Sequence, residues 1–586
     1  MLFPVSSVLA KEQGTVRKKW TGRLPVALLY ANTYPVAVSN LGYQLVYTLL
    51  NRLDEVVCER FVYPADGGPL RSLESSRPLT DFPLVFASVS FEHDYPRLAA
   101  MLAAGGIAPL AADRSDRVAA SSPLVVLGGV AVFMNPEPLA AFADLMVIGE
   151  AEPVLAELMT HLADYAALDR ESLLHRIGAS LPGCYVPALY RFVHGPDGVL
   201  ARIEPAAGLP PRVTRIMAPA MDVAAHSTLL SPEAELSMYM VELGRGCSRG
   251  CRFCAAGFIY RPPRLWPAET ILRGLEARPA GVDRIGLLGM EMAAPETVDQ
   301  IATLLAANSC SLSFSSLRAD RITDQTLSLL AASRLKSVAI AADGCSARLR
   351  RLINKGLDEP ELLDAAERLV ASGIFHLKLY VMIGLPTETN ADLDELVQLV
   401  DRLQTRILPL GRARGRVSVL TLSINCFVPK PWTPFQYCSF GGLEELPPGK
   451  QGTARALAAL KEKIGYLRGK LGSRSNLRLK FDHPDQALQQ AVYSRADRRI
   501  GEALLDIGTG RASFARALAR HGVDAWQYAI RPRRPDELLC WEVVDQGIRG
   551  DYLRDEYDRA LRGLATRPCE PALCRRCGVC REATSA

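Results

Sequence analysis

GRGCSRGCRFCAAG, residues 244–257, is the most informative stretch of this sequence. Its three cysteines, Cys247, Cys251 and Cys254, have the spacing C-x3-C-x2-C and directly follow a strand-like run. Three thiolates on one short loop can bind three irons of a cubane cluster and leave the fourth iron without a protein ligand. A catalytic metal needs such an open position. The alternative is a zinc knuckle completed by a remote residue, although zinc sites of this kind usually have two paired-cysteine halves.

This loop belongs to a series of strand-like runs that alternate with helical segments. From Met238 onward the expected strands are YMVELGRG, DRIGLLGMEM, CSLSFSSLRAD, LKSVAIAADG, HLKLYVMIGLP and VSVLTLSINCFVPKPW. Such an alternation predicts a partial or complete TIM-like β/α barrel. The working face of a β/α barrel is the carboxyl end of its strands, and the cysteine loop follows the first of them.

The preceding part of the chain predicts a separate parallel α/β sheet. Its expected strands are LPVALLY (24–30), PLVFASVSF (83–91), PLVVLGG (123–129) and ADLMVIGEAE (143–152). Gly128, Gly129 and Gly149 come at strand ends, where they either face a ligand at the carboxyl edge of the sheet or only form tight turns.

These patterns divide the chain into four parts. We expect an α/β class protein with a flavodoxin- or Rossmann-like domain at 1–205, a linker at 206–237, the barrel at 238–440 and a mixed C-terminal domain at 441–586. The last part begins with a long helix and ends in a cysteine-rich tail. Basic side chains gather at Arg412, Arg414, Arg416, Lys461, Lys463, Arg468 and Lys470. Such a group is either a solvated face or a track for an RNA backbone.

Composition restricts the class of protein. A chain of 586 residues with 49% hydrophobic side chains is expected to form packed cores rather than to be disordered. Its net charge of +5 neither requires nor excludes an anionic partner. No apolar run approaches the ~18 residues that span a bilayer, and the first segment has its charges after its apolar stretch, the wrong order for a secretory signal. We therefore expect a cytoplasmic protein without a membrane span, in which clustered cysteines bind metal rather than form disulfides.

The cysteine loop resembles the signature of the radical S-adenosylmethionine (SAM) superfamily. The resemblance depends on the cysteine spacing, on Phe253 directly before the third cysteine, and on the position after the first barrel strand. It implies a 4Fe-4S cluster on Cys247, Cys251 and Cys254, whose open iron chelates SAM. One electron then cleaves SAM reductively, and the resulting 5′-deoxyadenosyl radical takes a hydrogen atom from the substrate. The barrel orients the reactants and keeps water from the radical.

Residues at the ends of later strands match positions that contact SAM in this family. The implied cofactor-binding set is Phe253, Gly289, Met290, Glu291, Ser316, Arg318, Asp343, Arg348, Met382, Ile383 and Gly384. A carboxylate at Glu291 suits the methionine ammonium, and a cation at Arg318 suits the carboxylate. Each residue could also be ordinary barrel structure. Relatives usually have Pro-Glu-Ala-Gly where this chain has ADGC at 342–345, so Asp343 reaches the ribose with one methylene fewer.

The resemblance extends over nearly the whole chain, to bacterial radical SAM proteins with an amino-terminal cobalamin-binding-like domain. Other matching segments are YANTYPVAVSNLG, SLESSRPLTDF, NPEPLAAFADLMVIGEAE, VPKPWTPFQ, YSRADRRIGEALL and CRRCGVC. The usual Asp-x-His-x-x-Gly signature of a cobalt-ligating histidine is missing, because FEHDYPR places His93 before Asp94. Cobalamin binding is therefore one expectation for the first domain, and a lid that shapes the active site is the other.

The tail contains a second group of thiols. Cys569, Cys574, Cys577 and Cys580 have the spacing C-x4-C-x2-C-x2-C. These four thiols can surround one metal centre if the loop folds back on itself, as it does in ferredoxin-like sites. We expect a second iron-sulfur cluster that delivers electrons or supports the structure; structural zinc and thiol chemistry are the alternatives.

The sequence thus indicates a radical SAM enzyme and is compatible with more than one reaction. The leading hypothesis is transfer of a methyl group to an unactivated carbon of a larger substrate, such as RNA or a protein. A cobalamin-independent radical oxidoreductase or rearrangement enzyme is one alternative. A non-catalytic iron-sulfur sensor or RNA-binding protein is the other. An enzyme of this kind also needs a reducing partner such as flavodoxin or ferredoxin.

Overall fold

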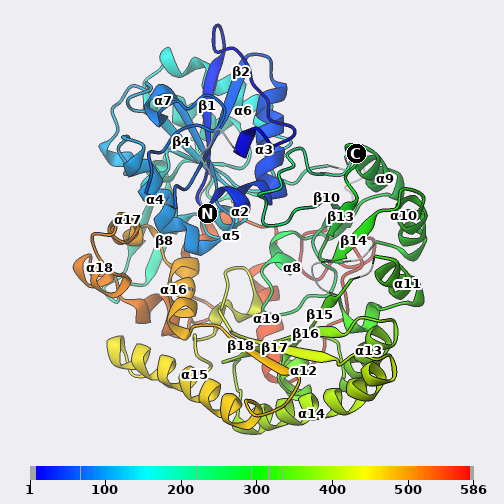
Figure 1. The fold of residues 1–586 in the computed structure, drawn as a ribbon. Coiled ribbons are helices and arrows are strands. Elements are labelled where there is room, and N and C mark those ends of the chain that lie inside the picture. The colour runs from blue at the N-terminus through cyan, green and yellow to red at the C-terminus, as the bar shows by residue number, and fades with distance from the viewer. Residues whose placement is uncertain are drawn as a thin grey trace.

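The computed structural model has an α/β fold with three parts. The residues it describes are 8–65, 67–219, 221–291, 293–314, 317–333 and 335–580. In Figure 1 the first α/β unit is blue to cyan, the second is mostly green, and the C-terminal elements run from yellow to red. Within the described residues, no helix combines the length and the apolarity needed to cross a membrane.

The first unit is built on a six-stranded sheet with the order β2-β1-β3-β4-β5-β6. The strands are β1 (Leu24–Tyr30), β2 (Val56–Val62), β3 (Leu84–Ser88), β4 (Leu124–Gly128), β5 (Leu145–Val147) and β6 (Cys184–Tyr185). Strands β1 to β5 are parallel, and β6 is antiparallel to β5. All four expected strands are present, while β2 has no counterpart among them. In this flavodoxin-like order, the direction in which strands are added reverses between β1 and β3, and ligands bind at such a point.

Both faces of this sheet are buried. Along β1, Ala27 and Leu29 face one hydrophobic core, and Val26 and Leu28 face the other, as the period of a strand requires. Helices cover both faces, which is usual for a parallel sheet. On the Val26 side they are α3 (Leu41–Arg52), α6 (Leu155–Leu162) and α7 (Arg170–Ser180), and on the Ala27 side α4 (Tyr95–Ala104).

The second unit contains seven strands in two parallel sheets, β10-β13-β14 and β15-β16-β17-β18. The strands are β10 (Tyr239–Glu242), β13 (Arg284–Leu288), β14 (Ser311–Phe314), β15 (Ser337–Gly344), β16 (His376–Ile383), β17 (Val419–Cys426) and β18 (Leu477–Phe481). A parallel bridge between Leu317 and Ile340 joins the two sheets. The six strands expected from the sequence are all present. Among the described strands none pairs β18 with β10, so the barrel is partial.

Helices cover the outside of this partial barrel (Figure 1). They are α9 (Ala268–Glu276), α10 (Pro295–Ala307), α11 (Asp324–Ala332), α13 (Glu359–Ala371) and α14 (Asn390–Ala413). The long basic helix expected after the barrel is α15 (Gly449–Leu471), and it leads into β18. The second sheet therefore takes its last strand from the segment expected to belong to the C-terminal domain.

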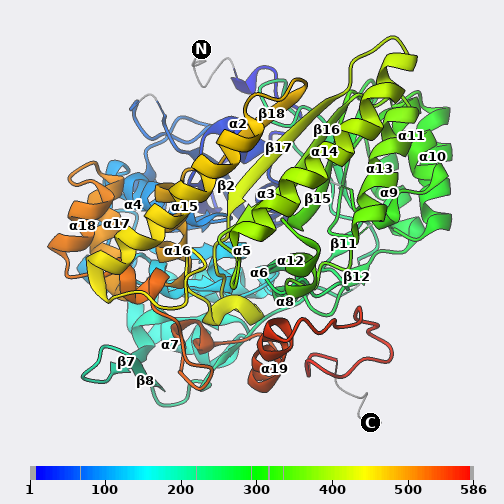
Figure 2. The ribbon, with the colours of Figure 1, turned by 90° about the horizontal axis from the view of Figure 1, so that it is seen from below.

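The remaining C-terminal elements contact both units. Helix α16 (Pro484–Arg495) ends beside the first unit, where the Asn135 side chain donates to the carbonyls of Ser494 and Ala496 at 3.0 and 2.9 Å. Helix α19 (Gly550–Leu561) and the tail lie along one side of the second unit (Figure 2). The last part of the chain thus bridges the two α/β units.

Candidate active site

The three-cysteine loop lies between β11 (Gly244–Arg245) and α8 (Ala256–Ile259). The Cys254 amide donates to the Cys251 carbonyl at 3.0 Å, which turns the backbone tightly between these two residues. Gly246 has a φ of +89°, and a side chain there would meet the Tyr260 carbonyl oxygen at 2.7 Å. Glycine is therefore required directly before Cys247.

The three thiols share a buried environment. Burial raises the pKa of Cys247 to about 11 and that of Cys254 to about 12, and it also raises the pKa of Cys251. Within the described residues, no set of three Cys, His, Asp or Glu side chains has the geometry of a bound metal ion. Repulsion from the Cys251 and Cys247 thiolates nevertheless contributes to the pKa shift of Cys254, so the three groups are near one another.

The donor set and its surroundings fit a thiolate-bound cluster. Two nearby cations lower the thiol pKa values that burial raises. Arg318 lowers the pKa of Cys247, and Lys355 lowers the pKa of Cys251. Thiolates rather than thiols are the metal ligands, so nearby cations favour the ligating form. These cations would also offset the negative charge of a cluster with three thiolate ligands.

A buried arginine holds the loop in place. Arg252 lies between the second and third cysteines and its side chain is fully buried. Its guanidinium pairs with Glu556 of α19 at 3.1 Å and donates to the carbonyls of Leu352 and Leu564 at 2.9 and 2.7 Å. The conformation of the cysteine loop therefore depends on segments that are distant in sequence.

Several residues expected to contact SAM lie around this loop. The Glu291 carboxylate accepts hydrogen bonds from the backbone amide of Ser248, at 2.9 Å, and from its hydroxyl. Arg318 donates to Asp320 at 2.9 Å and to the Lys355 carbonyl at 3.0 Å. Asp343 pairs with the Lys355 ammonium at 2.5 Å. The structure thus brings Glu291, Arg318 and Asp343 to the surroundings of the cysteines.

The other expected SAM contacts have structural partners. Arg348 pairs with Asp392 at 2.5 Å, at the start of α14. The Met382 carbonyl accepts from the Cys345 thiol at 3.2 Å, and the Ile383 carbonyl accepts from the Phe427 amide at 2.9 Å. The assignment of these residues to SAM stays a prediction.

Glycine and aromatic positions complete the expected set. Gly384 has a φ of +79°, and a side chain there would meet Leu460 at 2.7 Å. Phe253 is partly buried against the main core. Gly289 and Met290 line a large cavity. Ser316 lies outside the described residues.

The cysteines of the tail gather beside the first loop. The Cys569 amide donates to the Ser248 carbonyl at 2.7 Å, and Ser248 directly follows the first cysteine of the loop. Burial, together with the nearby thiolates of Cys574, Cys577 and Cys580, raises the pKa of Cys569 to about 11. The four tail thiols are therefore near one another, although within the described residues they do not have the geometry of a bound metal ion.

A cavity of about 520 Å³ opens between the two α/β units. Its volume is in the range of about 300–1,000 Å³ that is typical of small-molecule sites. From the first unit it is lined by the carboxyl ends of β1, β3, β4 and β5, including the switch point between β1 and β3. From the second unit it is lined by Glu242, Gly244 and Arg245 and by Leu288, Gly289 and Met290. The cavity therefore connects the ligand edge of the first sheet to the first two strand ends of the barrel.

The three strand-end glycines lie at the edge where the cavity opens, and their role in facing a ligand stays a prediction. Gly128, Gly129 and Gly149 line the cavity. Gly129 and Gly149 also have φ values of +104° and +117°, and a side chain at either would meet backbone atoms of Val89 or Ile216 within 2.5 Å. They allow a close backbone approach at the edge where the cavity opens.

An ion-pair network that the sequence analysis did not identify forms one wall of this cavity. Arg245 pairs with Glu150 at 2.9 Å, with Glu152 at 2.6 Å and with Glu242 at 3.0 Å. Arg264 also pairs with Glu150. Burial raises the pKa of Glu242, while the neighbouring Arg245 lowers it. The network joins the GEAE segment after β5 to the strand that precedes the cysteine loop. In the sequence, the only signal for this network is that its charged residues come directly after strands.

The histidine of FEHDYPR lies elsewhere. The His93 ring contacts Phe91 and Tyr493, with centroid distances of 5.3 and 6.0 Å. Burial lowers its pKa. His93 is not among the described residues that line the cavity. This placement agrees with the missing cobalt-ligand signature.

Several known proteins are similar to this chain. An uncharacterized protein of Methanocaldococcus jannaschii is 24% identical over 501 residues, which are 84% of this chain and 94% of that protein. The ribosomal protein uS12 methylthiotransferase RimO of Chlorobium phaeobacteroides is 25% identical over 191 residues, which are 30% of this chain and 44% of RimO. The similarity to RimO therefore covers less than half of that enzyme.

Two solved structures are also similar. The radical SAM methyltransferase TsrM from Kitasatospora setae has a TM-score of 0.49 and 13% identity, over 85% of this chain and 98% of TsrM. The cobalamin-dependent SAM radical enzyme OxsB has a TM-score of 0.43 and 14% identity, over 66% of this chain and 53% of OxsB.

Two family models match the chain in the order of its domains. Residues 42–187 match the model of radical SAM proteins, N-terminal, and residues 241–400 match that of the radical SAM superfamily. The second match contains the three-cysteine loop, and the two matches together span more than half of the chain. The chain therefore belongs to the radical SAM superfamily.

Proposed function

We propose that this protein is a cobalamin-dependent radical SAM methyltransferase, which adds a methyl group to an unactivated carbon. Membership in the superfamily implies SAM and a 4Fe-4S cluster, for which Cys247, Cys251 and Cys254 are the ligands. The cavity between the two α/β units supports the further step to cobalamin and methyl transfer. It extends from the switch point of a flavodoxin-like sheet to Gly289 and Met290, so that a ligand held there could meet SAM.

The lining of the cavity fits a large planar ring held mainly by apolar contacts. Leu28, Leu41, Val126 and Phe133 are among its apolar walls, and Asn40 and Ser90 offer polar groups at one side. The described residues that line the cavity include no histidine, so this chain would offer cobalt no imidazole there. Bound cobalamin would supply a carrier for the methyl group between SAM and the substrate. The chain would hold the ring, exclude water and fix its distance from the SAM site.

The overall reaction balances with two molecules of SAM. One gives its methyl group and leaves as S-adenosylhomocysteine. The other is cleaved to methionine and 5′-deoxyadenosine, which carries away the hydrogen atom that the methyl group replaces. Two electrons from a reducing partner, such as flavodoxin or ferredoxin, complete each turnover.

Blocking the cavity tests this function. In Ala151→Phe a phenyl ring would occupy space at the cavity wall, since Ala151 lines it. We expect the dissociation constant for cobalamin to rise by about tenfold or more, because overpacking costs about 1–3 kcal/mol. The rate of cobalamin-dependent S-adenosylhomocysteine formation should fall by a similar factor. Absorbance titration of the anaerobically reconstituted protein measures binding, and chromatography of the products measures both SAM-derived species.

The matched control adds the same side chain outside the cavity. Ala156 is exposed on α6 and does not line the cavity, so Ala156→Phe should bind cobalamin as the unaltered protein does. Equal cobalamin binding by both variants would contradict the assignment of the cavity. Deoxyadenosine without cobalamin-dependent S-adenosylhomocysteine would instead favour a cobalamin-independent oxidoreductase or rearrangement enzyme.

We also propose that the four tail cysteines hold a second iron-sulfur cluster that passes electrons to the first. The support is their mutual proximity and the hydrogen bond from the Cys569 amide to the Ser248 carbonyl. The guanidinium of Arg261, which donates to the Tyr552 hydroxyl at 3.0 Å, lies beside the Cys577 thiol and would offset the charge of such a cluster. Structural zinc in this site is the competing assignment.

Cys574→Ala separates these assignments. We expect the variant to lose about four iron atoms per chain, because Cys574 would be one of four cluster ligands. Deoxyadenosine formation should fall strongly with flavodoxin as the reductant and much less with dithionite, which reduces the first cluster directly. An unchanged iron content together with loss of zinc, measured by elemental analysis, would establish structural zinc instead. The isolated Cys310 is the control, and Cys310→Ala should lose neither metal.

A further inference from the structure

A second, smaller cavity lies where the C-terminal segment meets the first α/β unit. It has a volume of about 30 Å³, enough for two water molecules or a small anion. One side is the hairpin of β7 (Tyr190–His194) and β8 (Leu200–Pro205), and the other side is the end of α16 and the segment 527–540. The cavity shares no lining residue with the large one.

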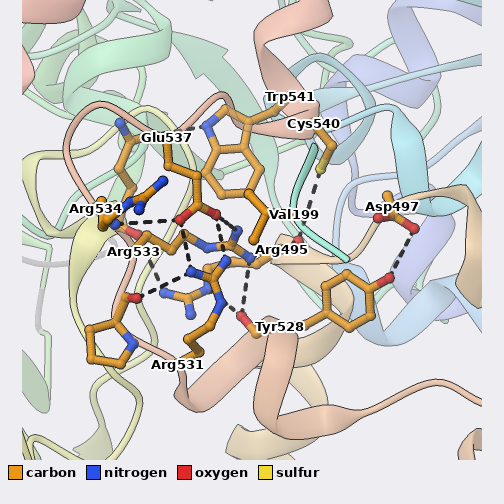
Figure 3. Close-up of polar contacts among 12 residues, drawn as sticks. Val199, Arg495, Asp497, Tyr528, Arg531, Arg533, Arg534, Glu537, Cys540 and Trp541 are labelled. Atoms are coloured by element: carbon orange, nitrogen blue, oxygen red, sulfur yellow. Dashed lines mark hydrogen bonds and ion pairs between the residues drawn. The ribbon is translucent and has the colours of Figure 1, made fainter. Parts of the chain in front are cut away.

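Arg495, the last residue of α16, lies at the centre of this site (Figure 3). Its side chain is fully buried. The guanidinium donates to the carbonyls of Tyr528 and Cys438, each at 2.7 Å, and no carboxylate of the described residues pairs with it. Its Nη2 atom is buried without a hydrogen-bond partner. A buried guanidinium held only by neutral carbonyls is energetically costly.

Two further arginines share one carboxylate beside it. Arg531 donates to both oxygens of Glu537, at 2.8 and 2.5 Å, while Arg533 reaches Glu537 only at 3.4 Å. Figure 3 shows these guanidinium groups next to that of Arg495. The Nε atoms of Arg531 and Arg533 are buried without partners. Burial and the neighbouring cations lower the pKa of Arg495, which shows how unfavourable its environment is for a positive charge.

Positive charge therefore exceeds negative charge around the cavity. Its lining includes four guanidinium groups, those of Arg495, Arg499, Arg531 and Arg533. Among the described residues that line it, the only two carboxylates are Glu537 and the Asp497 that pairs with Arg499 at 2.6 Å. The excess is two positive charges. Buried charges in proteins are normally paired, so the missing partner is an anion with a charge close to −2.

From this arrangement we infer that the small cavity is a binding site for a phosphate group. A phosphate monoester has a charge of about −1.5 to −2 at pH 7 and three acceptor oxygens. Guanidinium groups match phosphate oxygens in both charge and hydrogen-bond geometry. The partnerless Nη2 of Arg495 and Nε of Arg533 supply donors that no carboxylate of the chain uses. The ligand would tie the β7–β8 hairpin of the first unit to the C-terminal segment.

The mouth of the cavity determines which phosphates can enter. Arg499 is 43% exposed in its side chain, and Gly198 of the hairpin is half-buried. The phosphate oxygens would bind inward, and an ester group would point to solvent. Inorganic phosphate and a small phosphate monoester would present the same oxygens to the guanidinium groups. Only the monoester would place an ester group at the mouth of the cavity.

Binding of inorganic phosphate to the full-length protein tests the inference. We expect phosphate, compared with chloride at equal ionic strength, to raise the Tm by roughly 2–5 °C when it is present at about 100 times its Kd. Glycerol 3-phosphate in a parallel titration distinguishes the sources, because tighter binding than inorganic phosphate indicates a monoester ligand and weaker binding indicates the free ion. Either result supports the site, and equal Tm values in phosphate and chloride would overturn it.

Arg533→Gln is the decisive variant. It removes a cation that only shares Glu537 with Arg531, at 3.4 Å, so the Kd for phosphate should rise about tenfold or more, as expected for loss of a charged hydrogen bond. Without phosphate, the same variant should be at least as stable as the unaltered protein, because the excess charge is smaller. If Arg533→Gln does not fold, Arg499→Gln at the exposed mouth should also weaken phosphate binding. Equal phosphate affinity in the variant that folds and in the unaltered protein would contradict the site.

Arg534 provides the matched control for these variants. It adjoins Arg533 in sequence, but its side chain is 72% exposed and it pairs with Asp536 at 3.7 Å. Arg534→Gln should bind phosphate with unchanged affinity. A weakening equal to that of Arg533→Gln would mean that the general positive charge of the surface, rather than the cavity, attracts phosphate, and it would overturn the inference.

Discussion

Cys251→Ala is expected to abolish the cleavage of SAM. Cys251 lies in the middle of the three-cysteine loop, and a cluster held by the two remaining thiolates would lose its attachment or its geometry. Deoxyadenosine should fall below detection, and the iron content should fall by about four atoms per chain. Quantification of deoxyadenosine and iron after anaerobic reconstitution measures both effects.

A cysteine outside both groups controls for loss of a thiol as such. Cys184→Ala removes a buried thiol of the first unit, so some loss of stability is acceptable, but SAM cleavage per folded protein should be retained. A Cys251→Ala protein that still forms deoxyadenosine at the normal rate would contradict the assignment of Cys251 as a cluster ligand. Absence of deoxyadenosine from the unaltered protein with its cluster loaded would instead favour the non-catalytic sensor or RNA-binding alternatives.

Arg245→Met is expected to cause the largest loss of stability. The variant leaves the carboxylates of Glu152 and Glu242, which are only 15% and 17% exposed, without their cation, while Glu150 keeps Arg264. Removal of one partner of a buried ion pair costs about 3–5 kcal/mol. Urea unfolding at pH 7 should show this loss, with the midpoint shifted to lower denaturant concentration.

The pH dependence of this variant has a definite sign. Without Arg245, burial and the charge of Glu152 outweigh the hydrogen bond from Trp266, and they raise the pKa of Glu242 in the folded protein above the value in the unfolded chain. The folded state then binds more protons, so the deficit should shrink as the pH falls from 7 toward the pKa of an unfolded glutamate, about 4.3. Comparing urea midpoints at pH 7 and 5.5 measures it. A deficit that grows on acidification would contradict burial of these carboxylates.

An exposed ion pair is the control for Arg245. Arg202 pairs with Glu204 on the surface, and its side chain is 60% exposed. Exposed pairs contribute about 0–1 kcal/mol, so Arg202→Met should shift the urea midpoint little at either pH. The contrast separates loss of a buried charge partner from loss of an arginine.

The sequence predicts the strands well where hydrophobic periodicity is strong, and it fails where buried charges interrupt it. Strand β1 is present over Leu24–Tyr30, as expected. Strand β2 was not expected, because VVCERFV contains Glu59 and Arg60, which are nevertheless 3% and 1% exposed. Arg60 pairs with Glu12 and Glu74, so the partners that make its burial possible lie outside the strand. A local pattern contains no information on such partners.

The candidate site likewise has features that the sequence predicts and features that it does not. The three cysteines were identifiable because their spacing is local, within one loop. The network of Arg245 with Glu150 was not, because its members come from different domains. The contact of Cys569 with Ser248 joins residues more than 300 positions apart, and no spacing rule relates them. Prediction from one sequence therefore finds ligand loops more readily than the packing that positions them.

The position of Arg252 has a consequence for the time at which the cluster loop is completed during synthesis. Its partner Glu556 is about 300 residues further along the chain, and a ribosome adds about 5–20 residues per second. The cysteine loop therefore leaves the ribosome roughly 15–60 seconds before the helix that neutralises its central arginine. During that interval the three thiols belong to an unfinished loop, accessible to the proteins that insert iron and sulfide. Arrival of α19 and the tail then completes the packing around the loop, so the order of synthesis leaves an interval for metal insertion before final packing.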